Sequence, residues 1–336
     1  MDGQALSKGA PKGIKITIIG MGLIGTSLGM AIRDADAKDA PLGPTVITGY
    51  DKDRRAVGDA RGRLAIDREA RSLDDALHEA QIVVVAVPVQ AVRDVFREIA
   101  PLLPNGAVVT DVASTKTQVL VWARELLPST VEFIGGHPMA GKEQSGPGGA
   151  DPALFNGAIY CLTASQRARP QAIELVEAMV RQIHAKVYYI DAAEHDAYVA
   201  GVSHLPFMLS AALVDLVGNS PGWKEMAPLA ASGFRDISRL ASGDPEMHRD
   251  ICITNQAALV RWLEDAARRL LDLRDLIEAG ESDQILEFFQ RAHAAREEWL
   301  TSRPNLRPGE GDFEDMSGAG VTRPSRRATC RCRAGR

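Results

Sequence analysis

The sequence predicts an α/β fold: an N-terminal, doubly wound parallel sheet followed by an all-α domain. Three observations predict this class. A glycine-rich segment separates a β-branched run from a helical stretch near the start of the 336-residue chain. Apolar runs then alternate with helical stretches, which is typical of strands joined by crossover helices. Helical periodicity alone follows. We therefore expect a sheet domain over 13–191, a helical domain over 192–302, a frayed segment 1–12 and a disordered tail 303–336.

The glycine-rich segment has the spacing of a dinucleotide-binding fingerprint. A strand expected over 14–19 leads into Gly20-Met21-Gly22-Leu23-Ile24-Gly25, and a helix is expected from there to about residue 36. Gly20 permits the tight turn, Gly22 lets a pyrophosphate approach the backbone, and Gly25 allows close packing of helix on strand. Leu23 and Ile24 lie at the helix start, whose N–H groups and partial positive charge favour phosphate. We expect a Rossmann-type domain.

The second predicted strand, over 46–50, ends at Asp51. A carboxylate there accepts hydrogen bonds from a ribose 2′-hydroxyl and repels a 2′-phosphate, so NAD is expected rather than NADP. The separation from the glycines exceeds the usual ~20 residues, which a longer connection over 36–44 explains. Arg54 and Arg55 follow closely and leave NADP open as an alternative.

The same alternation of strands and helices continues to residue 190. Strands are expected over 82–87, 107–111, 131–134, 157–163 and 186–190, and helices over 90–102, 116–127 and 170–184, with a short helix starting at Ser72. Ligands of such sheets bind beyond the carboxyl ends of the strands. Gly20, Asp51, Pro88, Ser114 and His137 all follow a predicted strand, and Val87 ends one. We therefore expect the site at this edge, with Val87 and Pro88 beside the cofactor.

A loop expected over 135–141 holds His137 between two glycines and Pro138. Histidine titrates near neutral pH and can take a proton from a hydroxyl; capping of a turn is the alternative role. Ser114 is expected to cap the helix that follows it, or to hydrogen-bond His137 or a substrate oxygen. Lys116 either neutralises an anion or lies on the surface.

The second half of the chain is expected to be helical over 193–218, 223–241, 245–279 and 282–300. If continuous, the third stretch would reach ~50 Å at about 1.5 Å per residue. Its apolar face, which includes Leu259, Trp262, Leu263 and Leu270, has no sheet to cover. Such helices pack on each other or on a second subunit, so we expect a homodimer formed by this half.

Composition and charge argue against several classes of protein. The chain is 45% hydrophobic and 25% charged, which is ordinary for a soluble globular protein. A net charge of −5 gives no reason to expect nucleic acid or an anionic membrane as partner. No apolar run reaches the roughly 18 residues of a membrane span, and four scattered cysteines favour neither a disulfide scaffold nor a metal site. We expect a cytoplasmic protein with a small-molecule substrate and no metal.

Seven motifs resemble those of the prephenate dehydrogenase family, which includes arogenate dehydrogenases. In order they are GMGLIGTSLGMAI, GYDKD, VVVAVPVQAV, VTDVASTK, GGHPMAGKEQSG, GVSHLP and GFRDISRLASGDPEMHRDI, across about residues 14–300. The resemblance implies NAD(P)-dependent oxidative decarboxylation on the route to tyrosine, by a Rossmann domain joined to a helical dimerisation domain. It also implies that His137 takes the proton of the substrate's ring hydroxyl, that Ser114 is its partner near the nicotinamide, and that Arg239 grips a substrate carboxylate.

Two positions depart from the pattern of many relatives. Phe207 replaces a second histidine after Ser203-His204-Leu205-Pro206, and His248 replaces a tryptophan. We expect His204 and His248 to lie at the substrate; a structural role is the alternative for His204. Lys142 would repel an ammonium group if it faces the substrate, which favours prephenate over arogenate.

The main prediction is therefore an NAD-dependent prephenate dehydrogenase that forms 4-hydroxyphenylpyruvate. An arogenate dehydrogenase or a dual-specificity cyclohexadienyl dehydrogenase is the close alternative. A β-hydroxyacid dehydrogenase would need a catalytic lysine motif, and none is apparent in the sequence. A non-catalytic NAD-binding sensor would keep its function after replacement of His137.

Overall fold

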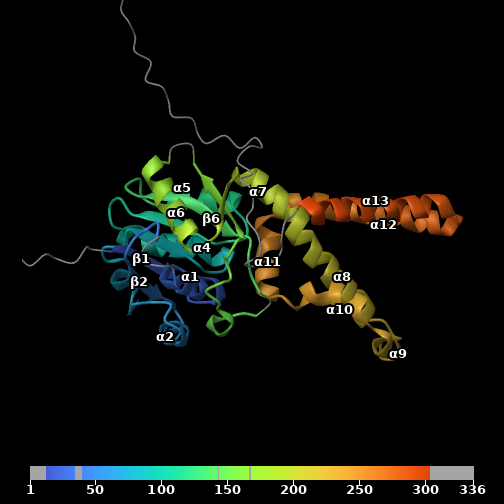
Figure 1. The fold of residues 1–336 in the computed structure, drawn as a ribbon, viewed down its shortest axis with the longest axis horizontal. Helices are drawn as coiled ribbons and strands as arrows, with labels where there is room; N and C mark the ends of the chain where they lie inside the picture. The colour runs from blue at the N-terminus through green and yellow to red at the C-terminus, as the bar shows by residue number, and fades with distance from the viewer. Residues whose placement is uncertain (1–12, 35–39, 143, 166–167, 303–336) are drawn as a thin grey trace, which may run out of the picture.

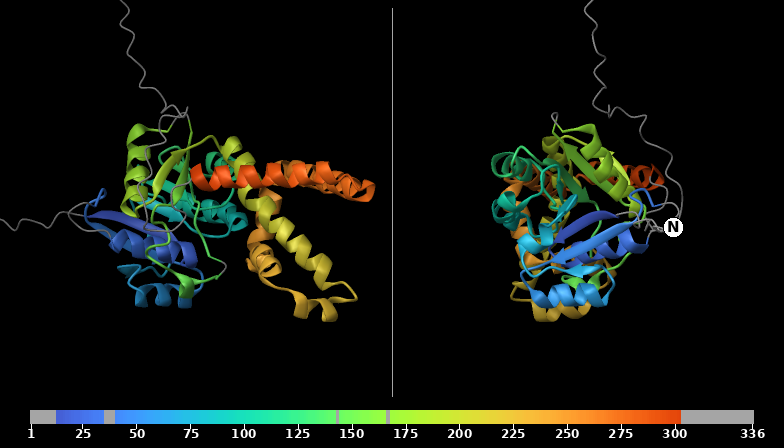
Figure 2. Two further views of the ribbon diagram at one scale, coloured as in Figure 1. Left: turned by 45° about the vertical axis from the view of Figure 1, so that its right-hand side comes forward. Right: turned by 90° about the vertical axis from the view of Figure 1, so that its left-hand side faces the viewer.

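The computed structural model describes residues 13–34, 40–142, 144–165 and 168–302. The predictions for the segments 1–12 and 303–336 lie outside the described residues. Figure 1 shows a sheet domain formed by the first half of the chain and helices that project from it. The left view of Figure 2 shows that these helices leave one side of the sheet domain as separate arms.

The sheet has eight strands in the order β3-β2-β1-β4-β5-β6-β7-β8. They are β1 (Ile14–Ile19), β2 (Thr45–Tyr50), β3 (Arg68–Glu69), β4 (Ile82–Val85), β5 (Val108–Asp111), β6 (Glu132–Pro138), β7 (Ile159–Ala164) and β8 (Lys186–Tyr189). The expectation of a wholly parallel sheet is wrong at one place, because β7 runs antiparallel to β6. The described residues between these two strands form no α-helical crossover, and a chain that returns without a crossover pairs antiparallel.

Helices cover both faces of the sheet, as expected for a doubly wound fold. They are α1 (Leu23–Asp34), α2 (Arg54–Gly62), α3 (Leu73–Leu77), α4 (Val89–Ile99), α5 (Thr117–Leu126) and α6 (Pro170–Gln182). Ile82 and Val84 of β4 belong to the core on one face, and Val83 and Val85 belong to the core on the other. This double burial explains why β4 is apolar without alternation.

The second half of the described chain is helical throughout. Its helices are α7 (Ala192–Val199), α8 (Leu205–Gly218), α9 (Trp223–Met226), α10 (Ser232–Ser238), α11 (Pro245–Thr254), α12 (Gln256–Ala279) and α13 (Ser282–Ser302). Two predicted helices are therefore broken. The stretch 223–241 becomes α9, α10 and short 3₁₀ turns, and the stretch 245–279 is interrupted at Asn255, where the backbone leaves the helical conformation with φ −123° and ψ 32°.

A turn of π-helix over 200–204 joins α7 to α8. Pro206 lies in the first turn of α8, where it has no N–H to donate and its ring excludes the carbonyl four residues back, so the helix widens locally. Gly201 lies in this turn because a Cβ there would be 2.7 Å from the ring of Trp262. The missing side chain at Gly201 thus lets Trp262 of α12 pack closely against the α7–α8 junction.

Most apolar side chains of the helical half are not buried within a single chain. Only Ala258 and Leu259 of α12 are buried, and α13 has no buried residue. Large apolar side chains on α8, α12 and α13 stay exposed, including Leu216, Leu270, Ile277, Phe289 and Trp299. Exposed apolar surface of this kind is typical of a site where another protein chain packs.

Candidate active site

The glycine-rich segment has the geometry of a cradle for a dinucleotide. Gly20 has φ +100°, and a Cβ there would lie 2.3 Å from the carbonyl oxygen of Ala86. A Cβ on Gly25 would lie 1.9 Å from the carbonyl oxygen of Gly20, whereas a Cβ on Gly22 would meet no atom within 4 Å. Gly20 and Gly25 are thus required by the fold, and Gly22 faces the open space that a pyrophosphate needs.

Replacement of two of these glycines by alanine separates folding from cofactor binding. Gly25→Ala is expected to destabilise the protein by about 1–3 kcal/mol or more, because its Cβ meets backbone rather than a flexible side chain. Gly22→Ala is expected to leave the melting temperature unchanged and to weaken NAD binding at least tenfold. Thermal denaturation and calorimetric titration with NAD measure the two effects. A lowered melting temperature for Gly22→Ala would contradict this assignment.

Asp51 lies at the tip of β2, directly beside the cradle. One carboxylate oxygen accepts a hydrogen bond from the backbone N–H of Met21 at 2.8 Å, and the other accepts from the N–H of Asp53 at 2.8 Å. Arg54 turns away, because its guanidinium donates to the carbonyl of Ala70 and lies 3.9 Å from Glu69. The position therefore presents a carboxylate at the cradle, which fits NAD better than NADP.

The other two predicted cofactor residues follow β4. A methyl group of Val87 would lie 3.0 Å from a Cβ on Gly20, so Val87 borders the cradle. Pro88 occupies the N-cap position of α4 with φ −51° and ψ 143°. Leu23 and Ile24 open α1, as expected from the fingerprint.

His137 lies inside a strand, which corrects the expectation of a loop over 135–141. β6 continues to Pro138, and His137 pairs in register with Cys161 of β7. The preceding glycines serve packing: a Cβ on Gly136 would lie 2.5 Å from the carbonyl oxygen of Asp111, and one on Gly135 would lie 2.2 Å from Thr163 Oγ1. Antiparallel pairing with β7 thus holds His137 on a rigid element.

The environment of His137 favours its neutral form. The residue is 8% exposed. Burial lowers the pKa of His137 well below its ordinary value, and the positive charge of nearby Lys116 acts in the same direction. An unprotonated imidazole at neutral pH is the state that a general base requires.

Lys116 is fully buried beneath this strand, so the surface alternative considered for it is wrong. Its ammonium group pairs with Asp111, also fully buried, and donates to the carbonyl of Gly136 at 2.6 Å. Burial lowers the pKa of Lys116, and the charge of Asp111 opposes that shift. The pair ties the end of β5 to β6, one residue before His137.

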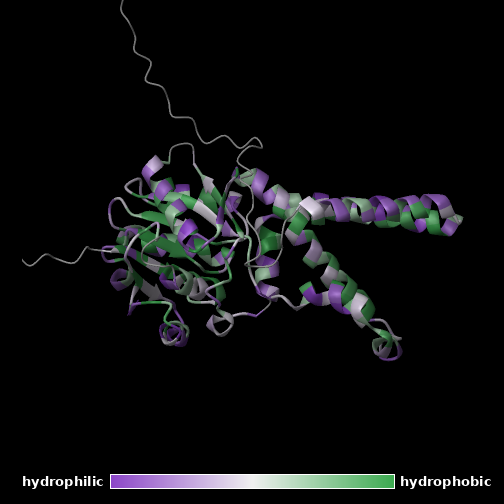
Figure 3. Cartoon of the chain, in the orientation of Figure 1, coloured by the Kyte–Doolittle hydropathy of each residue, from purple (hydrophilic) through white to green (hydrophobic). Residues whose placement is uncertain are grey.

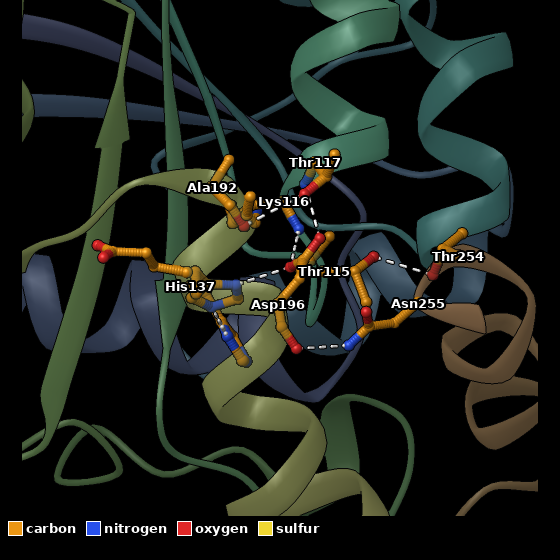
Figure 4. A network of polar contacts seen from close by, with 12 residues as sticks. Thr115, Lys116, Thr117, His137, Ala192, Asp196, Thr254 and Asn255 are labelled. Atoms are coloured by element: carbon orange, nitrogen blue, oxygen red, sulfur yellow. Dashed lines mark hydrogen bonds and ion pairs between the residues drawn. The ribbon is translucent and has the colours of Figure 1, made fainter. Parts of the chain in front are cut away.

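The expectation that Ser114 caps the following helix is also wrong. α5 begins at Thr117, and the carboxylate of Asp196 on α7 accepts from the N–H groups of Lys116 at 2.7 Å and Thr117 at 2.8 Å. Ser114 is half-buried in the β5–α5 connection. Asp196 therefore joins the helical half to the sheet domain by capping a helix that is distant in sequence (Figure 4).

His195 and Asp196 are the residues at this site that sequence reasoning missed. His137 Nδ1 and His195 Nε2 are 2.8 Å apart, and His195 Nδ1 is 2.8 Å from Asp196 Oδ1. His195 is fully buried and Asp196 is 5% exposed. The signal available in the sequence was weak, because adjacent His and Asp residues early in a helix are common on solvent-exposed helix faces.

The predicted substrate residues lie mainly on the helical half. His204 is buried in the π turn with Nδ1 3.4 Å from the amide nitrogen of Asn255, and its Nε2 is enclosed without a partner. Burial lowers the pKa of His204 to about 4. His248 stacks on Phe207 with ring centroids 4.0 Å apart and planes 3° from parallel. The two departures from the family pattern are therefore in contact with each other.

Arg239 and Lys142 have different environments. Arg239 begins a 3₁₀ turn that follows α10, and it is exposed. Lys142 is bound at 2.9 Å to Asp151, whose backbone N–H donates to Ser27 Oγ of α1. Because Asp151 neutralises Lys142, the charge argument for prephenate over arogenate loses its basis.

The chain matches two families over most of its length. The family described as "Prephenate dehydrogenase, nucleotide-binding domain" matches residues 42–189, and "Prephenate dehydrogenase, dimerization domain" matches residues 191–291. A prephenate dehydrogenase of Lactococcus lactis subsp. cremoris is 35% identical over 290 residues, which cover 84% of this chain and 77% of the relative.

Two solved structures share the fold over nearly their whole length. The prephenate dehydrogenase of Aquifex aeolicus, in complex with hydroxyphenyl propionate and NAD+, has a TM-score of 0.78 at 26% identity and covers 85% of this chain and 98% of its own. The arogenate dehydrogenase of Synechocystis has a TM-score of 0.71 at 32% identity and covers 85% and 100%. Together with the cradle and the buried histidine, these similarities show that the chain belongs to the prephenate dehydrogenase family.

Proposed function

We propose that the protein oxidatively decarboxylates prephenate to 4-hydroxyphenylpyruvate with NAD, in tyrosine biosynthesis. The observation that carries the proposal is His137, a buried histidine with a lowered pKa on a strand beside the dinucleotide cradle. Its relatives named as prephenate dehydrogenases support the substrate.

The residues of the chain have distinct tasks in this reaction. Gly20, Gly22 and Gly25 with the start of α1 would hold the pyrophosphate, and Asp51 would hold the ribose. When bound, NAD supplies the acceptor for the hydride of the hydroxyl-bearing ring carbon. His137 takes the hydroxyl proton, and the ring carboxylate leaves as CO2.

We also propose roles for the side chains that face the substrate. Arg239 would pair with a substrate carboxylate, since a guanidinium stays charged and binds a carboxylate in a bidentate manner. Ser114 would assist His137 at the nicotinamide. The stacked rings of Phe207 and His248, with His204 behind them, would line the wall that meets the substrate side chain.

Arogenate is the second candidate substrate, because the arogenate dehydrogenase of Synechocystis shares this fold. Initial rates of reduced-cofactor formation, measured with each substrate and with both NAD+ and NADP+, separate the candidates. We expect the highest kcat/KM with prephenate and NAD+. A higher value with arogenate would assign that substrate, and activity on neither would overturn both.

The lowered pKa of His137 predicts the pH dependence of kcat/KM. A base works in its neutral form, which is lost as the pH falls through its pKa. Because that pKa lies well below the ordinary ~6.5 of histidine, kcat/KM should stay flat through 6.5 and fall only in more acidic solution. The charged and titratable groups around His137 are His195 and His204 from the α7–α8 helix, Lys116 from the start of α5 and Cys161 from β7. An acidic limb at or above 6.5 would contradict this environment.

We propose further that the protein is a cytoplasmic homodimer joined through its helical half. The continuous helical segment 192–218, which comprises α7, the π turn and α8, is long and apolar enough to cross a membrane by length and composition alone. This is contrary to the expectation that no apolar run of the sequence reaches that length. Figure 3 shows its apolar residues along α8, and apolar and polar residues mixed along α12 and α13. A second copy of the chain is the proposed cover for these faces, and the match of residues 191–291 to a domain described as a dimerization domain supports it.

Substitution of an exposed leucine tests the dimer. Leu270 of α12 is 62% exposed, and Leu64 of the sheet domain is 68% exposed. Leu270→Asp is expected to shift the protein toward monomer in size-exclusion chromatography with light scattering, because a charge would be buried at the interface. The matched variant Leu64→Asp should remain dimeric. A monomeric wild-type protein would overturn the proposal.

A further inference from the structure

The hydrogen bonds around His137 form a chain that ends on a carboxylate. His137 Nδ1 bonds His195 Nε2 and His195 Nδ1 bonds Asp196 Oδ1, each at 2.8 Å. Asp196 in turn accepts from the backbone N–H groups of Lys116 and Thr117. The side chains of His137, His195 and Asp196 all lie in the protein interior. Figure 4 labels His137 and Asp196 at the two ends of this chain of bonds.

The carboxylate decides the direction of every hydrogen bond. Burial raises the pKa of Asp196, but hydrogen bonds from His195, Thr117 and Lys116 outweigh that effect and lower it overall. An ionised carboxylate only accepts hydrogen bonds, so His195 must carry a proton on Nδ1. A neutral His195 then has a lone pair on Nε2, which accepts a hydrogen bond from the N–H at Nδ1 of His137. His137 is left with its lone pair on Nε2.

We propose that His195, oriented by Asp196, is a positioning residue that holds His137 in the tautomer with a free Nε2, the nitrogen that takes the substrate's proton. This inference rests on the proposed function of His137 as a base. The substrate O–H bond breaks, its proton binds Nε2, and the bond from Nδ1 to His195 persists throughout. His195 touches neither substrate nor cofactor in this role.

The nitrogen that His137 uses in this chain of bonds supports the assignment. The bond to His195 involves Nδ1, and the residue keeps 8% of its surface exposed. If His195 Nε2 donated to His137 Nδ1 instead, His195 would carry a proton on both ring nitrogens in a fully buried position. This arrangement would also leave His137 with its proton on Nε2, unable to act as a base.

The same contacts explain how the helical half completes the site. The amide of Asn255 donates to the backbone carbonyl of Asp196 at 2.8 Å, and Thr115 Oγ1 donates to Thr254 Oγ1 at 2.9 Å. The break between α11 and α12 at Asn255 thus supports α7 at Asp196. The two domains are held in the register that places His195 against His137.

The test uses His195 rather than Asp196, because Asp196 also caps α5. In the 15N-labelled full-length protein without ligand, long-range 1H–15N correlation spectra report which ring nitrogen of each histidine carries the proton. We expect His137 and His195 both to carry it on Nδ1. His195→Leu removes the acceptor, so the form of His137 protonated on Nε2 should appear. His195→Gln can accept from His137 and donate to Asp196, so it should retain the wild-type form.

Turnover should follow the tautomer. We expect His195→Leu to lower kcat about 10²-fold with little change in KM, and His195→Gln to recover at least tenfold of that loss. His78→Gln, at an exposed histidine, is the matched control and should change neither quantity.

A wild-type His137 protonated on Nε2 overturns the proposal even if His195→Leu does not fold. A Gln variant that folds but is no more active than the Leu variant also overturns it. Because the spectra need no substrate, they test the tautomer even if prephenate and arogenate are both inactive.

Discussion

His137→Asn is expected to lower kcat with prephenate by about 10²–10⁴-fold, the range that general-base catalysis contributes. Asparagine keeps a polar side chain of similar reach, but its amide does not accept a proton at neutral pH. The substitution lies on β6, whose backbone pairing with β7 does not depend on the side chain. Folding and NAD binding should therefore be retained, which calorimetric titration with NAD can verify.

His78→Asn is the matched control for this variant, since His78 is an exposed histidine in the same domain. Steady-state rates for the two variants should differ by at least two orders of magnitude in kcat. Turnover of His137→Asn within a few-fold of the wild type would remove the base from the mechanism. It would favour a protein that binds NAD without acting through this residue.

Lys116→Met is expected to lower the free energy of unfolding by about 3–5 kcal/mol, because it leaves the charge of Asp111 buried and unpaired. Both side chains of this ion pair are fully buried. Asp111 would keep its hydrogen bonds from the N–H groups of Ala113 at 2.9 Å and Gly136 at 3.1 Å, which stabilise but do not neutralise the carboxylate. Methionine has a similar length, so the loss reports the charge rather than a cavity.

Urea denaturation of three variants tests this interpretation. The double variant Lys116→Met/Asp111→Asn should recover part of the loss, since it removes the unpaired charge. Lys15→Met breaks an exposed pair with Glu79 and should cost no more than about 1 kcal/mol. If Lys116→Met and Lys15→Met had equal effects, the buried pair would not hold β5 to β6 as described.

The local elements of the first domain could be predicted because their signals lie within short segments. The run 14–19 and the glycines after it require only their own backbone geometry, and β1, α1 and the cradle have the expected places. β4 is uninterrupted and apolar because it is buried on both faces. β3, with only two residues, left no comparable pattern and was not predicted.

Pairing and packing between distant segments could not be predicted in the same way. His137 was expected in a loop because two glycines and a proline surround it, yet the return of β7 makes this segment a strand. Lys116 was left as either an anion partner or a surface residue, because its partner Asp111 is buried only when β5 and β6 pair. The break at Asn255 follows from its bonds to Asp196 on α7 and to His204 in the π turn. Both partners lie more than 50 positions earlier in the sequence.

The sequence by itself determined the doubly wound domain and the dinucleotide cradle, because both depend on residue types at fixed spacing, and it offered His137 as a candidate base. Only the tertiary structure decided the environment in which His137 lies. His195 and Asp196 lie 58 and 59 positions further along the chain, as the spacings 137 to 195 and 137 to 196 give. They reach β6 because α7 packs against the start of α5, where the free N–H groups of a helix hold Asp196 ionised.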